Sequence, residues 1–145
     1  MLRVKIKTKN NAVLPKYQTN GSAGMDVCAL MDEETISILP GERKLIKTGL
    51  YIELPKGYEA QIRPRSGLAL KEGITVLNSP GTIDSDYRGE IGIILINHSD
   101  KIFIVKNGDR ICQMIIAKYE TIEWNIVEEL EETKRNTEGF GHTGI

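Results

Sequence analysis

Residues 81–92 carry the sequence GTIDSDYRGEIG, in which acidic residues, a tyrosine and glycines lie between apolar segments. Asp and Gly favour a tight reversal with positive φ, so Ile83 and residues 91–95 are predicted to form the two strands of a hairpin. Asp84 would then lie at the end of a strand. A carboxylate held beside the Tyr87 ring and bare backbone amides can act as a general base next to a flat ligand. The alternative is an ordinary acidic turn capped by Tyr87.

A second group of residues is suited to binding an anion. Residues 63–69 (RPRSGLA) follow a predicted strand and open the one helical turn that the sequence indicates. Ser66 is expected to cap this turn, leaving free backbone N–H groups beside Arg63 and Arg65. The alternative is a structural cap without a ligand. Gln113 lies in an otherwise apolar segment, and by itself it is more simply read as bonding to neighbouring backbone than to a ligand.

The C-terminal end frames one aromatic residue with glycines, in the sequence EGFGHTGI over residues 138–145. Glycines let backbone amides approach an anion, His142 and Thr143 can donate to phosphate oxygens, and Arg135 can pair with them. Phe140 offers a π face to a nucleobase. The alternative is a flexible terminus with an isolated phenylalanine.

Strands must position these groups, because apolar residues recur with a period close to two along most of the chain. Strands are predicted over residues 2–7, 35–39, 50–54, 58–63, 91–96, 102–105 and 111–117. The last three are dense apolar runs, expected to be covered on both faces. Short turn sequences separate the runs, which is typical of an all-β sandwich or barrel, here with one helical turn over residues 66–71.

Composition bounds the remaining possibilities. The 145 residues suit one domain, and a net charge of −1 argues against a partner such as double-stranded nucleic acid. The first seven residues alternate charged and apolar side chains, unlike a secretory signal, and no stretch is long enough to span a membrane.

Cys28 and Cys112 lack metal-binding spacing, so two buried free thiols in a cytoplasmic protein are predicted. From about residue 128 the chain becomes acidic, which predicts a β domain over residues 1–127 and a mobile arm over residues 128–145.

Five segments in this order resemble the five motifs of the trimeric deoxyuridine triphosphatase (dUTPase) family. They are residues 23–29 (AGMDVCA), 64–69 (PRSGLA), 81–92 (GTIDSDYRGEIG), 108–115 (GDRICQMI) and 139–144 (GFGHTG). The resemblance implies a jelly-roll-like β barrel, a homotrimer whose three active sites each take motifs from all three subunits, and Mg²⁺-dependent hydrolysis of dUTP to dUMP and pyrophosphate. That activity keeps uracil out of DNA and supplies dUMP for thymidylate synthesis.

The resemblance also implies roles for single residues. Asp84 would be the general base that activates the attacking water, and Tyr87 would pack against the deoxyribose and exclude a 2′-hydroxyl. Asp26 would act on the water shell of Mg²⁺, which is held mainly by the phosphates. Uracil would be bound near Asn78, Gly81, Thr82, Ile83 and Gly92, and the phosphates by Arg65, Ser66, Gly67 and Gln113. In the tail, Phe140 would cover the uracil while Arg135, Gly141, His142 and Thr143 close over the phosphates.

The fifth motif departs from the pattern common in the family. Asn136 and Glu138 stand where two glycines are common, and His142 stands in place of a serine. Glu138 brings a negative charge near the γ-phosphate, so these departures bear on tail closure and affinity.

Two other functions fit parts of the same pattern. A dCTP deaminase, alone or bifunctional, shares the fold and a similar nucleotide, but its relatives usually lack the Gly-Phe-Gly tail. A non-catalytic nucleotide-binding trimer would have no need of Asp84, Tyr87, Arg65 and Gln113 together. A nucleic-acid binder fits least, because the sequence has no basic stripe interleaved with aromatics.

Overall fold

The computed structural model describes residues 1–139, which form twelve strands and one short helix. The strands are β1 (Lys5–Thr8), β2 (Lys16–Tyr17), β3 (Met25–Cys28), β4 (Thr35–Ile38), β5 (Arg43–Lys47), β6 (Leu50–Glu53), β7 (Tyr58–Arg63), β8 (Ile74–Val76), β9 (Gly81–Ile83), β10 (Gly92–Asn97), β11 (Phe103–Lys106) and β12 (Arg110–Lys118). The helix is α1 (Ser66–Glu72). The all-β prediction with one helical turn is therefore confirmed.

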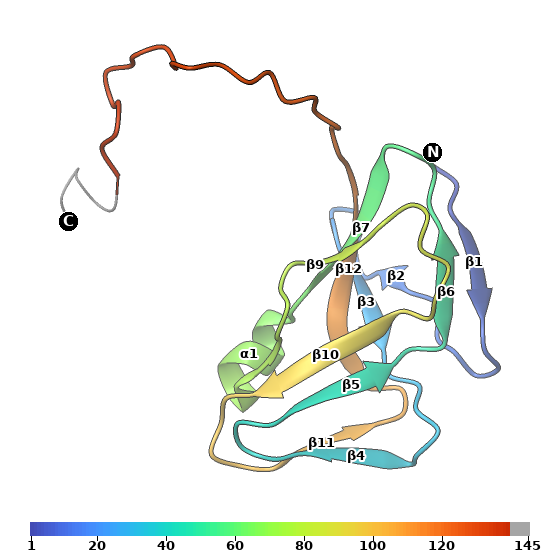
Figure 1. Cartoon of the computed structure of the whole chain (residues 1–145). Coiled ribbons are helices and arrows are strands. Elements are labelled where there is room, and N and C mark those ends of the chain that lie inside the picture. The colour runs from blue at the N-terminus through green and yellow to red at the C-terminus, as the bar shows by residue number, and fades with distance from the viewer. Residues whose placement is uncertain (140–145) are drawn as a thin grey trace.

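The strands form four antiparallel sheets rather than a closed barrel in the described part of the chain. The largest has the order β2-β3-β12-β7-β9, and a second has the order β5-β10-β8. Two further pairs, β1-β6 and β11-β4, complete the body. In Figure 1 the strands β10 and β5 cross over β12 and β3, and buried side chains from both larger sheets belong to one apolar cluster. Burial of this cluster is the main stabilising term of the fold.

Glycine turns join several strands where the sequence predicted reversals. Gly41, Gly57 and Gly108 have φ of +74°, +87° and +88°, a backbone region that costs glycine little and other residues more. They lie in the predicted turns at residues 39–42, 55–57 and 106–109. The two strands that each of these turns joins lie in different sheets, so the turns carry the chain from one sheet to another.

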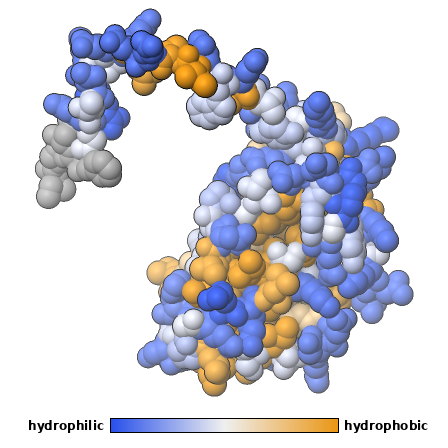
Figure 2. Space-filling model, in the orientation of Figure 1, coloured by the Kyte–Doolittle hydropathy of each residue, from blue (hydrophilic) through white to orange (hydrophobic). Residues whose placement is uncertain are grey.

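The dense apolar runs are not covered on both faces within one chain. In β10 buried and half-buried residues alternate after Gly92, in β12 residues 115–117 are only half-buried, and in β11 only Val105 is buried. Leu45, Ile102 and Ile104 are 61%, 58% and 49% exposed. Figure 2 shows apolar surface gathered on the face that carries β5, β10 and β11. An exposed patch of this kind marks an interaction surface.

The C-terminal part leaves the body after β12. The Tyr119 N–H donates to the Gly57 carbonyl at 3.1 Å, and residues 119–139 form no strand or helix. Figure 1 shows this segment running away from the sheets. It carries exposed apolar side chains, among them Trp124 (83%) and Ile126 (93%). The boundary at residue 127 and the mobility of the arm stay predictions.

Asn97 provides a test of the packing at the end of β10. It is fully buried, its side-chain NH₂ donates to the carbonyls of Ile38 (2.9 Å) and Lys101 (2.7 Å), and its Oδ1 accepts from the Ser99 N–H (2.9 Å). Asn97→Ala leaves these groups without their partner and should lower the free energy of unfolding by about 3 kcal/mol. Urea denaturation measures this, with the exposed Asn125→Ala as control. A loss equal to that of the control would contradict the prediction.

Candidate functional site

The segment over residues 81–92 does not form the predicted paired hairpin. The strand β9 pairs with β7, whereas β10 pairs with β5 and β8, so the two strands belong to different sheets. No residue between them has positive φ. The eight-residue connection is long enough to reverse without a left-handed residue, and Ile91 is held instead by Leu50 and Thr48. Its N–H donates to the Leu50 carbonyl at 2.8 Å, and its carbonyl accepts from the Thr48 hydroxyl at 2.6 Å.

A cavity of about 200 Å³ opens where these two strands diverge. Its lining includes seven residues that were predicted from the sequence to bind the nucleoside or to act in catalysis. They are Asn78, Gly81, Thr82, Ile83, Asp84, Tyr87 and Gly92. Apolar side chains of Ile62, Val76, Ile91 and Ile93 complete it. The structure thus brings together the nucleoside-binding residues that the sequence predicted.

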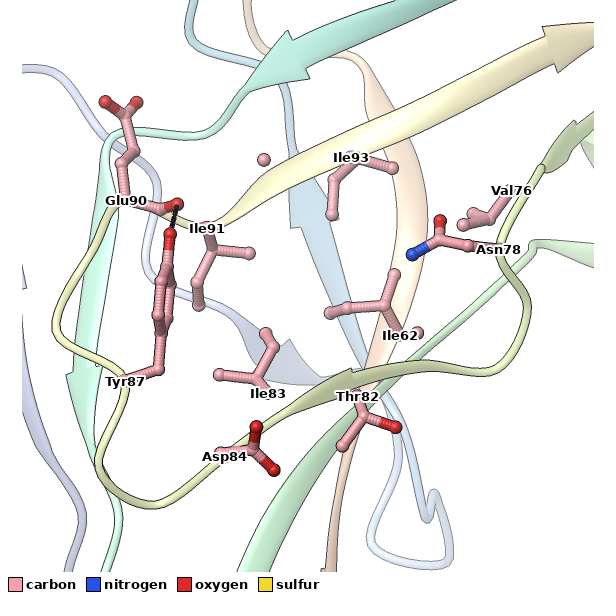
Figure 3. A pocket seen from close by; sticks show the side chains of 12 residues that line it. Ile62, Val76, Asn78, Thr82, Ile83, Asp84, Tyr87, Glu90, Ile91 and Ile93 are labelled. Carbon is pink, nitrogen blue, oxygen red and sulfur yellow. Dashed lines mark hydrogen bonds between the residues drawn. The ribbon is translucent and has the colours of Figure 1, made fainter.

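Figure 3 shows how the lining residues face the cavity. The side-chain amide of Asn78 points toward the space between Ile62 and Ile93, and Asp84 lies at the opposite end beside Thr82. β9 borders the cavity and is the edge strand of its sheet, so the peptide groups on its outer side face no neighbouring strand. An apolar cavity with main-chain polar groups and one side-chain amide can bind a flat ring that has hydrogen-bonding groups at its edge.

Tyr87 closes one side of the cavity. Its hydroxyl donates to the Glu90 carbonyl at 3.1 Å, the contact drawn as a dashed line in Figure 3. The ring lies over Gly89, where any Cβ would collide with the tyrosine hydroxyl. A larger residue at position 89 would displace the Tyr87 ring. Gly89 does not have a positive φ, which corrects the expectation of a left-handed glycine at this tip.

Asp84 follows β9 directly, as predicted. Ile83 is in register with Ala60 of β7, so the strand leading into the carboxylate is held by the five-stranded sheet. The Asp84 side chain is exposed, and no hydrogen bond to its carboxylate is recorded among residues 1–139. A carboxylate held at its base and open to solvent can accept a proton from water.

Charged residues form a second cluster at the join of β3, β12 and α1. The Asp26 carboxylate is 8% exposed and lies 3.5 Å from Arg65 Nε and 3.2 Å from an Arg110 guanidinium nitrogen. Arg65 also donates to the Arg110 carbonyl at 2.8 Å. Gln113 is half-buried and in register with Asp26 across the β3–β12 pair. Asp26 thus fixes two guanidinium groups whose other donors remain available to an anion.

Ser66 does not cap the helix. Arg65 is the N-cap residue, no side chain caps the helix, and Ser66 is the first helical residue. The capping prediction was wrong by one position because Arg65 has the extended backbone (φ −93°, ψ 127°) that the cap position requires. Ser66 and Gly67 are exposed at this end of α1, so their N–H groups face outward without an intrahelical partner.

The two cysteines and the possible metal ligands were also predicted from the sequence. Cys112 is buried, and desolvation raises its pKa to about 12, whereas Cys28 is only half-buried. The prediction of two buried free thiols therefore holds for one of them. Among the residues described, no group of three His, Cys, Asp or Glu side chains could hold a metal ion.

The structure does not unite all predicted residues. None of Arg65, Ser66, Gly67, Gln113 or Asp26 lines the 200 Å³ cavity of the same chain. In the tail, the Arg135 Nε–H donates to the Glu138 carbonyl at 2.9 Å. Phe140, Gly141, His142 and Thr143 lie outside the described residues.

Two residues of the cavity and the charged cluster were not predicted from the sequence. Glu90 lines the cavity and Arg110 grips Asp26. The signal for Glu90 was a carboxylate directly before an apolar run, where a half-buried charge needs partners. Separately, no described helix is long and apolar enough to cross a membrane.

Comparison with known proteins agrees with this geometry. A family model described as dUTPase matches residues 10–144. A deoxyuridine 5′-triphosphate nucleotidohydrolase of Finegoldia magna is 58% identical, over 99% of each chain, and one of Ehrlichia canis is 53% identical over 100% of this chain and 95% of that protein.

Solved structures give the same result at lower identity. A dUTPase of Staphylococcus bacteriophage 80alpha, solved with dUpNHpp, is 27% identical, covers 99% of each chain and has a TM-score of 0.84. The dUTPase of phage phi11 of S. aureus, whose structure concerns the coordination of a structural Mg(II) ion, is 26% identical over 90% of this chain and 99% of that one, with a TM-score of 0.78. The chain therefore belongs to the dUTPase family.

Proposed function

We propose that this chain hydrolyses dUTP to dUMP and pyrophosphate. The observation that carries the proposal is the main-chain-lined cavity between β9 and β10, with Asp84 at its edge and Tyr87 at its side. Family membership over nearly the whole chain supports the substrate. The reaction would keep uracil out of DNA and supply dUMP, and we place it in the cytoplasm.

Uracil enters the cavity edge-on, and the backbone at Gly81, Thr82, Ile83 and Gly92 offers it a donor and an acceptor. Cytosine presents the opposite pattern at position 4, so buried polar groups would be left without partners. Tyr87 packs against the deoxyribose and leaves no room for a 2′-hydroxyl. Asn78 contributes its side-chain amide at the inner end.

Hydrolysis is a direct displacement. Water attacks the α-phosphorus, its proton passes to the Asp84 carboxylate, and the bond from the α-phosphorus to the bridging oxygen breaks as pyrophosphate leaves. Arg65, the Ser66 and Gly67 backbone, and Gln113 hold the phosphate chain. These residues supply cationic and N–H donors where negative charge develops.

Mg²⁺ fits this site as a substrate-borne ion. It prefers phosphate oxygens and water, and it supplies neutralisation of the triphosphate charge. Asp26 is the one buried carboxylate of the arginine cluster, and carboxylate lone pairs beyond its two arginine contacts can accept hydrogen bonds from metal-bound water.

The active unit is a homotrimer. The phosphate-binding cluster and the nucleoside cavity do not line one space in a single chain, which is expected if each site takes them from different subunits. The exposed side chains Leu45, Ile102 and Ile104 give the chain apolar surface to bury against its copies. In this assembly Phe140 stacks on the bound uracil, and Arg135, Gly141, His142 and Thr143 close over the phosphates.

The test is product analysis on the intact chain with Mg²⁺. Incubation with dUTP should release pyrophosphate and dUMP, while dCTP and UTP should react at least about a hundredfold more slowly. Removing the metal with EDTA should suppress the dUTP reaction. Ammonia from dCTP would indicate the deaminase alternative, and no turnover of either nucleotide would indicate a binding trimer.

A further inference from the structure

The Glu90 carboxylate joins the active-site loop to a neighbouring strand pair. Its Oε1 accepts from the Gly49 N–H at 3.0 Å, and its Oε2 accepts from Lys9 Nζ at 2.8 Å and from the Tyr51 hydroxyl at 3.2 Å. The side chain is 19% exposed. Burial opposes ionisation, but Lys9, the Gly49 N–H and Tyr51 together hold the pKa of Glu90 below its usual range.

Glu90 also contacts Tyr87, through its own backbone carbonyl. The Tyr87 hydroxyl donates to the Glu90 carbonyl, and its ring lies across Gly89. Gly49, whose N–H donates to the Glu90 carboxylate, has φ +69°. A Cβ there would lie 2.6 Å from Leu30 Cδ2. A side chain at position 49 would be strained at this φ, so glycine suits the point at which the Glu90 carboxylate is anchored.

Asp84 depends on a different support. It leaves β9, whose partner is β7, whereas Glu90 is tied to the segment over residues 49–51. Loosening the Glu90 end of the loop would move Tyr87 while the strand before Asp84 keeps its register. The Tyr87 N–H also donates to the Asp84 carbonyl at 3.2 Å, so the two ends share one backbone contact. The strand pairing that holds Asp84 and the side-chain contacts that hold Glu90 are nevertheless different.

We propose that Glu90 is a positioning residue, which sets the Tyr87 wall of the nucleoside cavity through Gly49, Tyr51 and Lys9. This inference rests on the proposed function and adds a residue to its specificity. Its role is to fix the width of the cavity at the sugar, not to take part in the proton transfer. Loss of Glu90 therefore weakens nucleotide binding and 2′-deoxy selectivity more than it slows the chemical step.

The experiment compares Glu90→Ala and Glu90→Gln in the full chain. Glu90→Ala should raise KM for dUTP and Kd for dUpNHpp, measured by calorimetry, by about tenfold, because it leaves the Gly49 N–H without its acceptor. Its kcat should stay within about twofold, and the preference for dUTP over UTP should fall. Glu90→Gln keeps an acceptor oxygen for Gly49 and should recover most of the binding.

Controls separate this role from general stabilisation. Lys5 and Glu53 form an ion pair of the same 2.8 Å length on the β1–β6 pair, so Glu53→Gln should leave KM unchanged. If Glu90→Ala fails to fold, the surface variant Lys9→Ala should still raise KM about threefold, and Lys5→Ala should not. If the wild-type chain binds dUpNHpp and the Glu90 or Lys9 variants bind it equally well, the positioning role of Glu90 is overturned but the proposed function is not. A wild-type chain that neither binds dUpNHpp nor hydrolyses dUTP overturns the proposed function.

Discussion

Asp84→Asn should lower kcat for dUTP by about a thousandfold, the contribution typical of a well-placed general base. Asparagine has nearly the same size and can still accept a hydrogen bond from water, but it cannot take the proton. Because β9 is held by β7 up to Ile83, the substitution should not disturb the cavity. KM for dUTP should therefore change by less than about threefold.

The control for this prediction is Asp86→Asn. Asp86 is an exposed aspartate two residues along the same loop and does not line the nucleoside cavity. Rates are measured as pyrophosphate release at saturating dUTP with Mg²⁺. If Asp84→Asn retained more than about a tenth of wild-type kcat, another group would have to be the base.

Deleting residues 136–145 should remove most activity while leaving the folded assembly intact. The deletion takes away Phe140, His142 and Thr143, which are predicted to cover the nucleotide, so kcat/KM should fall by about a hundredfold. The stability of the β domain should not change, because every residue of the buried apolar cluster precedes residue 117. The melting temperature and the trimeric mass by light scattering should match those of the full chain.

Removing Ile145 alone provides the matched control, since it keeps the whole glycine-rich motif. A chain shortened to residue 135 that hydrolysed dUTP at the normal rate would show that the tail is dispensable. A shortened chain that was monomeric would instead show that the tail contributes to assembly. These two outcomes are separated by measuring mass and turnover on the same sample.

Strands with strict alternation were the most predictable part of the fold. The pattern of Tyr58–Arg63 and of Thr35–Ile38 places apolar residues on one face, and both are strands with the expected inward side chains. The strand Arg43–Lys47 was missed because its apolar pair is adjacent, with Ile46 buried and Leu45 exposed. The side chain of Leu45 is mostly exposed in the single chain, and we expect it to be buried in the proposed subunit contacts.

The nucleoside residues were predictable as a set, but their mutual geometry was not. A short motif indicated that residues 81–92 act together, yet it predicted a paired hairpin where two sheets diverge. That divergence is set by pairing with β7 and β5, which lie far away in sequence. Likewise the grip of Arg65 and Arg110 on Asp26 joins residues up to 84 positions apart, which local patterns do not reveal.

A binding wall made of peptide groups has a consequence for how the site can vary among relatives. A mutation can exchange the exposed Thr82 side chain without removing the amide and carbonyl that would contact a base. Substitution is instead more restricted at positions where a larger residue would force a neighbouring side chain to move. A Cβ on Gly92 would lie 2.8 Å from Leu45 Cδ1, and one on Gly89 would collide with Tyr87. Side chains of the wall can therefore change while the ligand stays the same, provided that any larger residue at position 89 or 92 is matched by a movement of Tyr87 or Leu45.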